Sequence, residues 1–241
     1  MTIAFISDLH ISETQSEIGE QFIDFLANQA VNYKMLYILG DLFEYWLGDD
    51  DTNPYLYKIR SALRKYTKTG IPTYFIHGNR DFLIGEKFAN ETGIKILSDP
   101  TIIRIYSEDI LISHGDLFCT DDVSYQATRK LTRDPKWQDM MLNKSLEERK
   151  AFALEARLKS TKHIKDIADD ITDVNHTEIA NTFKKFNLKT IIHGHTHRPA
   201  IHNLNIQNTD HQRIVLGDWY DQGSCLEWDE SGPNLINFYR R

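Results

Sequence analysis

The segment IAFISDLH, residues 3–10, joins a short apolar run to two side chains that can bind a metal ion. The apolar run predicts a buried strand over residues 3–7, and Asp8 and His10 follow it directly. The two side chains are two positions apart, so on a continuing strand they would point the same way. The segment therefore predicts a buried strand that ends in two polar metal ligands.

The same pattern recurs four times along the chain. Apolar runs at residues 35–39, 73–77, 110–113 and 190–192 each predict a strand. The motifs that follow them are Gly40-Asp41, Gly78-Asn79-Arg80-Asp81, His114-Gly115-Asp116 and His193-Gly194-His195-Thr196-His197. Ligands of α/β proteins gather at the carboxyl ends of neighbouring strands. The sequence therefore predicts one dinuclear metal site assembled from distant segments.

Seven side chains are the candidate ligands of this site. One ion is expected to take Asp8, His10, Asp41 and His197, and the other Asp41, Asn79, His114 and His195. Gly40 would let the backbone turn sharply and free the Asp41 carboxylate to bridge both ions, and Gly194 would relax the turn before His195. Oxygen and imidazole ligands without a thiolate favour Mn²⁺, Fe²⁺ or Zn²⁺. Two such ions would activate water to hydrolyse a phosphate ester or anhydride.

Helical periodicity separates the predicted strands. It appears over residues 17–31, 55–66, 81–90 and 177–186, which gives the alternation of a layered α/β fold. After residue 199 the pattern changes to short strands at residues 200–206, 213–216, 224–228 and 235–239. We expect these four to form one late β meander.

Residues 121–173 interrupt the alternation, and they predict helices at 123–131, 136–142 and 146–167. Residues 126–167 hold 11 Lys/Arg and 6 Asp/Glu, a net of +5, so the rest of the chain carries −7 − 5 = −12. Two hypotheses fit this basic segment: a lid over an anionic substrate, or a solvated helical hairpin whose charges face water. The length of 241 residues suits a single domain with such an insertion.

Composition limits the remaining classes of function. The net charge of −7 argues against nonspecific binding of nucleic acid. The apolar stretches fall short of the roughly 20 residues that a membrane span needs, and the N-terminus predicts a strand rather than a signal peptide. Cys119 and Cys225 show no paired spacing, so we expect reduced thiols in a cytoplasmic protein.

The five motifs together resemble the calcineurin-like metallophosphoesterase superfamily. They are Asp8-x-His10, Gly40-Asp41, Gly78-Asn79, His114-Gly115 and Gly194-His195-x-His197. The resemblance implies an α/β fold of two facing β sheets flanked by helices, with the metals at the sheet edge. It also implies that the basic insertion is a helical lid on that fold.

Longer stretches resemble one branch of that family, which hydrolyses a UDP-linked diacylglucosamine in lipid A synthesis. They are FISDLH at 5–10, LGDLFEYWLGDD at 39–50, HGNRDFL at 77–83, SHGD at 113–116, DVN at 173–175 and HGHTHRP at 193–199. The resemblance implies two Mn²⁺ ions per chain and UMP and 2,3-diacylglucosamine 1-phosphate as products. It further implies peripheral association with the anionic cytoplasmic face of the inner membrane.

The resemblance assigns roles to individual residues. Arg80 stands where many family members carry a His, and an Arg keeps its proton but can clamp a diphosphate. The implied catalytic residues are Asp41, Asn79, Arg80 and His195, and the implied substrate contacts are Asn79, Arg80, Asp122, Ser160, Lys162, Lys165 and His195. The two lysines are included because Ile164 and Ile167 depart from the polar residues expected there. Candidate acyl-chain contacts are Trp46, Leu47, Tyr55, Phe82, Leu83, Trp137, Met140, Met141 and Phe152.

Two alternative functions remain at this point. The first is another dinuclear phosphoesterase, acting on dinucleoside polyphosphates or phosphodiesters. The second is a non-catalytic scaffold of the same fold that binds partner proteins, although such a scaffold is expected to have lost ligands. Activity on the acylated substrate distinguishes the implied hydrolase from the first alternative, and bound metal distinguishes it from the second.

Overall fold

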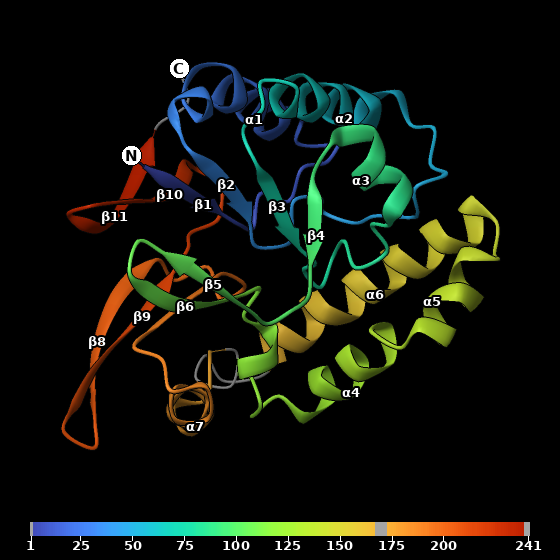
Figure 1. The fold of residues 1–241 in the computed structure, drawn as a ribbon. Helices are drawn as coiled ribbons and strands as arrows, with labels where there is room; N and C mark the ends of the chain where they lie inside the picture. Colours follow the sequence, from blue (N-terminus) through green and yellow to red (C-terminus); the bar gives the residue numbers. More distant parts are fainter. Residues whose placement is uncertain (1, 167–172, 239–241) are drawn as a thin grey trace.

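Two β sheets face one another, with helices outside them (Figure 1). The computed structural model describes residues 2–166 and 173–238, with side chains described up to residue 160 in the first range. The strands are β1 (Ile3–Ile6), β2 (Met35–Ile38), β3 (Thr73–Ile76), β4 (Lys95–Leu97), β5 (Thr101–Ile105), β6 (Glu108–Ser113), β7 (Thr190–His193), β8 (Ala200–Ile206), β9 (Thr209–Val215), β10 (Gly223–Asp229) and β11 (Gly232–Phe238). The predicted arrangement of two facing sheets is confirmed.

Helices follow the strands in the expected alternation. They are α1 (Ser16–Asn28), α2 (Pro54–Thr67), α3 (Glu86–Thr92), α4 (Val123–Thr132), α5 (Pro135–Leu142), α6 (Leu146–Asp166) and α7 (His176–Phe186), with short 3₁₀ turns η1 (Ala30–Asn32) and η2 (Asp116–Phe118). Local chemistry sets several of the helix starts. Asn53 caps α2 by accepting from the backbone N–H of Tyr55, and Pro54 occupies the first helical position, where its missing N–H costs nothing.

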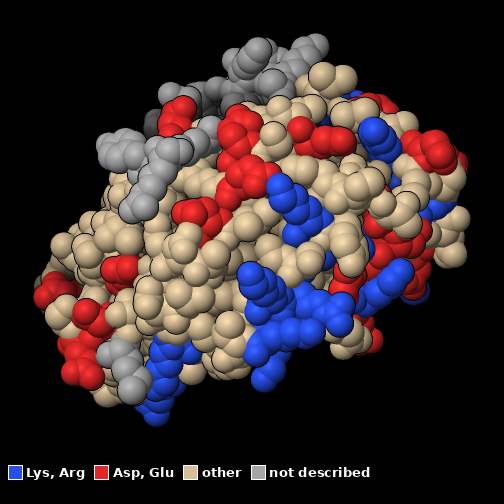
Figure 2. All heavy atoms as spheres, turned by 90° about the horizontal axis from the view of Figure 1, so that it is seen from above, with Lys and Arg blue, Asp and Glu red and all other residues tan. Residues whose placement is uncertain are grey.

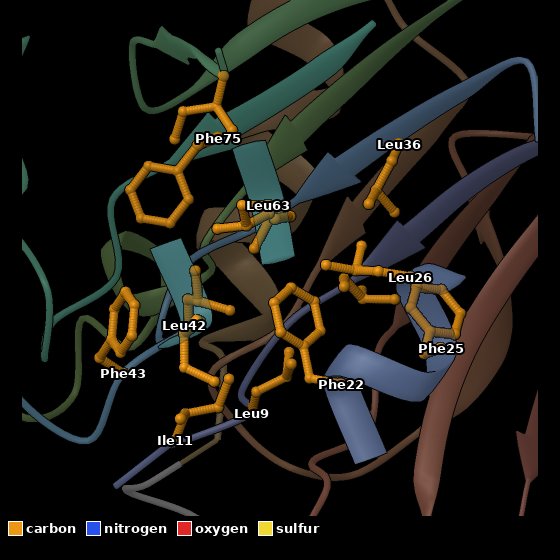
Figure 3. Packing of buried hydrophobic residues seen from close by; sticks show 14 of the residues in the cluster. Leu9, Ile11, Phe22, Phe25, Leu26, Leu36, Leu42, Phe43, Leu63 and Phe75 are labelled. Carbon is orange, nitrogen blue, oxygen red and sulfur yellow. The ribbon is translucent and has the colours of Figure 1, made fainter. Parts of the chain in front are cut away.

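The first sheet has the order β11-β10-β1-β2-β3-β4 and is buried on both faces. Ala4 and Ile6 of β1 point toward α1 and α2, whereas Ile3 and Phe5 point into the space between the two sheets. Figure 3 shows the helix-side core, in which Phe22 and Leu26 of α1 lie among side chains from the strands and from α2. This two-sided burial explains why β1 is a continuous apolar run.

The second sheet has the order β5-β6-β7-β9-β8, and α7 packs on its outer face. Within it, β6, β7 and β9 are parallel neighbours, which brings the carboxyl ends of β6 and β7 to one edge. The first sheet brings the ends of β1, β2 and β3 together in the same way. Both sheets therefore deliver their strand-end motifs to a shared edge.

Two secondary-structure predictions are wrong. The four late strands form two separate hairpins: β8 and β9 join the second sheet, whereas β10 and β11 join the first. The helix expected over 81–90 begins only at Glu86, because the Asp49 carboxylate accepts from the N–H groups of Gly85 and Phe88 and fixes the start there. The strands β4 and β5 were not predicted at all.

The insertion forms α4, α5 and α6, which lie together beside the strand ends (Figure 1). Among the described residues, none of the helices is both long and apolar enough to cross a lipid bilayer. Figure 2 looks down onto the face of the molecule that is uppermost in Figure 1, where acidic and basic side chains gather in separate groups.

Gly40 is a position where the fold depends on glycine, and Gly70 provides a matched comparison. Both have a left-handed backbone, with φ of 88° and 89°. A Cβ at Gly40 would lie 2.5 Å from the Gly78 nitrogen and 2.7 Å from His114 Nδ1, whereas a Cβ at Gly70 meets nothing within 4 Å. We expect Gly70→Ala to lower the free energy of unfolding by about 1–2 kcal/mol and Gly40→Ala to lower it by more. Urea unfolding of both variants measures the difference, and equal losses would contradict the close packing at Gly40.

Candidate metal centre and adjoining cavity

The metal-ligand motifs lie on loops that are joined by backbone hydrogen bonds. The N–H of Asp8 donates to Gly40 O (3.1 Å), that of His10 to Asp41 O (2.9 Å), and that of Gly194 to His114 O (2.8 Å). These bonds hold the ends of β1 and β2 together and the ends of β6 and β7 together.

Five of the candidate ligands have a left-handed backbone. They are Asp8 (φ 56°), His10 (54°), Asp41 (51°), His195 (67°) and His197 (54°). The chain does not continue as a strand through Asp8 and His10, because β1 ends at Ile6. Non-glycine residues in this region carry strain of about 1–3 kcal/mol each, which the surrounding packing must hold.

The seven side chains form two groups that meet at Asp41. In the first group, His197 Nε2 lies 3.2 Å from His10 Nε2 and 3.4 Å from Asp8 Oδ1. Asp41 Oδ2 lies 3.8 Å from His10 Nε2, whereas Asp41 Oδ1 lies 3.8 Å from His114 Nε2. Each carboxylate oxygen of Asp41 thus faces a different group.

The second group gathers around the side-chain oxygen of Asn79. His114 Nε2 and His195 Nδ1 each lie 2.9 Å from Asn79 Oδ1. The other nitrogen of His114, Nδ1, lies 2.9 Å from Leu39 O and must donate to it. Burial opposes the charged form of this ring, but nearby carboxylates, above all Asp41, raise the pKa of His114, so a cation bound at Nε2 would displace a proton.

In the first group, each histidine has a carboxylate beside its Nδ1. His10 Nδ1 lies 3.1 Å from Glu44 Oε2 and His197 Nδ1 lies 3.2 Å from Asp218 Oδ2. The Nε2 atoms of the two rings lie 3.2 Å apart, and that of His197 lies 3.4 Å from Asp8 Oδ1, so three potential ligand atoms gather at one point. Carboxylates that orient histidines in this way are typical of metal sites. The donor sets of both groups therefore fit divalent cations.

Burial and charge tune the histidines of the site. Burial lowers the pKa of His10 to about 4, and burial with the nearby His114 lowers the pKa of His195 to about 3, so both rings are neutral near pH 7. Burial also opposes the charged form of His197, but Asp218 and Asp8 raise its pKa to about 10. A cation bound at His197 would therefore displace a proton.

Gly194 serves a different purpose from the one expected. Its φ is not left-handed, but a Cβ there would collide with the Asp8 carboxylate and the Ser7 hydroxyl. This space lets the N–H of His195 approach Asp8 and donate to Oδ2 at 2.9 Å. Gly194 is thus required for close approach rather than for an unusual turn.

Three supporting carboxylates were not predicted from the sequence. Glu44 and Asp218 orient His10 and His197, as described above, and Asp81 is fully buried beneath the loops. The sequence signal that could have identified Glu44 is an acidic residue inside the apolar run LFEYWL. His193, the first residue of the last motif, is also fully buried; its Nδ1 donates to Gly194 O, and Arg213 donates to its Nε2.

Asp81 connects two of the ligand loops. Its carboxylate accepts from the N–H groups of Gly78 (2.8 Å), Leu42 (2.8 Å) and Asp41 (3.3 Å). In Asp81→Asn an amide NH₂ would face N–H donors, so at least one buried donor would lose its partner. We expect the free energy of unfolding to fall by about 1–3 kcal/mol.

A matched control for Asp81→Asn is Asp229→Asn, at an exposed turn whose carboxylate accepts from Ser231. Surface changes of this kind stay within about 0.5 kcal/mol. Denaturant unfolding of both variants is the measurement. A loss at Asp81 no greater than the loss at Asp229 would show that the buried carboxylate is not needed to hold the loops.

A cavity of about 580 Å³ opens beside the second group of ligands. Its polar lining includes Asn79, Arg80 and Tyr125, and its lining from the insertion includes Ser160. Arg80 has a buried Nε without a hydrogen-bond partner among the described residues. The large apolar side chains of the lining are Trp46, Leu47, Phe82, Leu83, Leu131, Trp137, Met141 and Phe152. Nearly all of these apolar positions were expected from the sequence.

Three other predicted contacts, Asp122, Met140 and Tyr55, are not part of this lining. Asp122 caps α4, where its carboxylate accepts from the N–H of Tyr125 at 2.8 Å. Met140 is half exposed, and Tyr55 lines a smaller hollow of about 260 Å³. The side chains of Lys162, Ile164 and Lys165, and residue Ile167, lie outside the described part of the chain.

Comparisons with known proteins agree with this geometry. The family model for calcineurin-like phosphoesterases matches residues 1–199. A UDP-2,3-diacylglucosamine hydrolase of Stenotrophomonas maltophilia (strain R551-3) is 47% identical over 247 residues, with 100% of both chains covered. The protein of the same name from Vibrio vulnificus (strain YJ016) is 44% identical and covers 98% of this chain and 97% of its own. A solved archaeal phosphodiesterase aligns with a TM-score of 0.50 at 12% identity, over 99% of this chain and 100% of its own, which shows the shared fold alone.

Proposed function

Because the chain belongs to the calcineurin-like phosphoesterase family, we propose that it hydrolyses the diphosphate bond of UDP-2,3-diacylglucosamine. The products would be UMP and 2,3-diacylglucosamine 1-phosphate (lipid X). One observation carries the proposal: Asn79 of the candidate metal centre lines a cavity of about 580 Å³ whose wall also includes Arg80 and many apolar side chains. Such a cavity suits a substrate that joins a diphosphate to acyl chains.

The chain is a metal-dependent hydrolase of this family, and we propose two Mn²⁺ ions as its cofactors. Asp8, His10, Asp41 and His197 would hold one ion, and Asp41, Asn79, His114 and His195 the other. When bound, the ions would supply an activated water and neutralise charge on the phosphoryl oxygens. The oxygen and imidazole donor set, without thiolate, supports Mn²⁺ over a structural zinc ion.

Arg80 would bind and orient the diphosphate. Its buried, unpartnered Nε and its place in the cavity wall leave a donor for a phosphate oxygen. An Arg holds its proton at any working pH, so its role is electrostatic. Asn79, which also lines the cavity, and His195, whose Nδ1 lies 2.9 Å from Asn79 Oδ1, would contact the same phosphate. The leaving group is itself a phosphate and needs little protonation.

Residues 121–173 would act as the lid of this site. Arg157 of α6 pairs with Glu44, the carboxylate that orients His10, so the insertion reaches the metal centre itself. The apolar lining from α4, α5 and α6 would bury the acyl chains. We propose that Asp122, Ser160, Lys162 and Lys165 contribute to holding the head group, in addition to the residues above.

We also propose that the protein works at the cytoplasmic face of the inner membrane, where an acylated substrate resides. Exposed apolar side chains on the insertion support this: Val123 (75% exposed), Leu131 (52%) and Leu158 (72%). Basic residues interleave with them and would favour an anionic leaflet. Sedimentation with anionic phospholipid vesicles tests the proposal, and equal recovery with neutral vesicles at low salt would contradict the electrostatic part.

A substrate comparison distinguishes the proposed activity from its alternatives. The chelator-treated protein, with Mn²⁺ restored, is assayed for UMP release from UDP-2,3-diacylglucosamine and for cleavage of diadenosine tetraphosphate. We expect the acylated substrate to have the higher kcat/KM. Preference for the dinucleoside polyphosphate would favour another dinuclear phosphoesterase, and absence of both activities with no bound metal would favour a scaffold.

A further inference from the structure

Arg129 of α4 lies between two carboxylates of the core. Its Nε is 3.0 Å from Asp116 Oδ2 and its Nη2 is 3.1 Å from Asp99 Oδ2. The side chains of Asp99 and Asp116 are only 9% and 0% exposed, and that of Arg129 is 21% exposed. The guanidinium therefore offsets part of the charge of two buried carboxylates that would otherwise repel each other. Arg133, whose Nη2 lies 3.7 Å from Asp116 Oδ2, adds a second positive charge.

Both carboxylates are attached to the turn that carries His114. Asp99 Oδ1 accepts from the Ser113 hydroxyl (2.6 Å) and from the backbone N–H of His114 (3.2 Å). Asp116 follows His114 by two residues. The Arg129 side chain thus links a helix of the insertion to both sides of one candidate ligand.

Two further contacts join α4 to the same region. The Tyr125 hydroxyl donates to Asp116 Oδ2 at 2.7 Å, and the Tyr125 ring lies 5.5 Å from the His195 ring. Gln126 donates to the backbone oxygens of Asp116 and Cys119. The first turns of α4 are therefore fastened to the loop after β6.

We propose that Arg129 is a positioning residue that couples α4 to the metal ligand His114. Packing of α4 fixes the His114 turn in its ligating position, and metal bound at His114 in turn stabilises α4. This inference rests on the metal centre proposed above. It gives the insertion a role in metal affinity besides that of covering the substrate.

Arg149 provides a matched control. It is a buried arginine of α6, 4% exposed, that donates to Leu47 O (2.6 Å) and pairs with Asp50. It also fastens the insertion to the core, but residues 47–50 include none of the seven candidate ligands. Loss of Arg149 should loosen the insertion without disturbing His114.

The test is a calorimetric titration of Mn²⁺ into chelator-treated protein, for the wild type, Arg129→Met, Arg129→Lys and Arg149→Met. Substitution of residues that orient metal ligands typically weakens affinity about 10- to 100-fold, and we expect a loss of that size at one of the two sites in Arg129→Met. Lys keeps the charge but reaches one carboxylate, so its loss should be smaller. Arg149→Met should bind Mn²⁺ as the wild type does. Hydrogen exchange adds a second measurement: Mn²⁺ should slow exchange in residues 123–132 of the wild type and not of Arg129→Met.

Unchanged Mn²⁺ affinity in folded Arg129→Met would overturn the coupling, as would an equal loss in Arg149→Met. If Arg129→Met does not fold, Arg129→Lys decides in the same way. A wild type that binds no Mn²⁺ would overturn the metal centre itself, which is a different outcome from a wild type and variants that bind equally.

Discussion

Replacing Asp41 with alanine is expected to abolish hydrolysis and to deplete metal from both sites. The two oxygens of this carboxylate face different groups of ligands, each 3.8 Å from a histidine nitrogen of its group. Removing one electrostatic group from an active site typically costs about 10²–10³-fold in kcat. Asp41→Ala should exceed that loss, because two cations would lose a ligand at once.

His10→Ala is the matched comparison, since His10 belongs to one group only. We expect it to lose about one metal ion per chain, whereas Asp41→Ala loses both. Elemental analysis of the purified variants, alongside UMP release, measures this difference. If Asp41→Ala retained two ions and more than a few per cent of the activity, Asp41 would not be the bridging ligand.

Arg80→Ala is expected to lower kcat/KM for UDP-2,3-diacylglucosamine by about 10²–10³-fold, by analogy with the loss of an oxyanion donor. Its guanidinium lines the cavity with an unpartnered Nε, so the substrate would receive its hydrogen bonds. Metal content should stay near normal. The contact of Arg80 with Asp41 is made by the backbone N–H (2.8 Å), which alanine keeps.

Arg80→Lys separates charge from geometry. Lysine retains the positive charge but lacks the planar fork that grips two phosphate oxygens, so we expect only partial recovery. Steady-state kinetics and metal analysis of both variants are the measurements. Loss of metal from Arg80→Ala would instead place Arg80 in the support of the metal centre.

The candidate ligands were predictable because each lies in a short motif next to a buried strand. Asp8 and His195, for example, are 187 residues apart, yet each follows an apolar run. Parallel pairing gathers strand ends at one edge of each sheet, and the facing of the two sheets brings those edges together. The alternation of strand and helix periods predicted a layered α/β fold, whereas the two facing sheets were implied by the resemblance to the calcineurin-like family.

The remaining features depend on tertiary contacts that carry no local signal. The start of α3 is set by Asp49. Its carboxylate accepts a hydrogen bond from the backbone N–H of Gly85, which lies 36 residues later in the sequence. The last two hairpins divide between the sheets, although their sequences look alike. The orienting carboxylate Asp218 is an isolated acidic residue, and only the folded chain brings it within 3.2 Å of His197.

Stoichiometric titration of the metal-free enzyme with Mn²⁺ tests the central proposal most directly. UMP released from UDP-2,3-diacylglucosamine is followed as Mn²⁺ is added to a known concentration of chelator-treated protein. We predict negligible activity without metal and a rise that saturates at two Mn²⁺ ions per chain, with 2,3-diacylglucosamine 1-phosphate formed in equal amount. Full activity in the metal-free protein, or saturation after a single ion, would contradict the dinuclear mechanism.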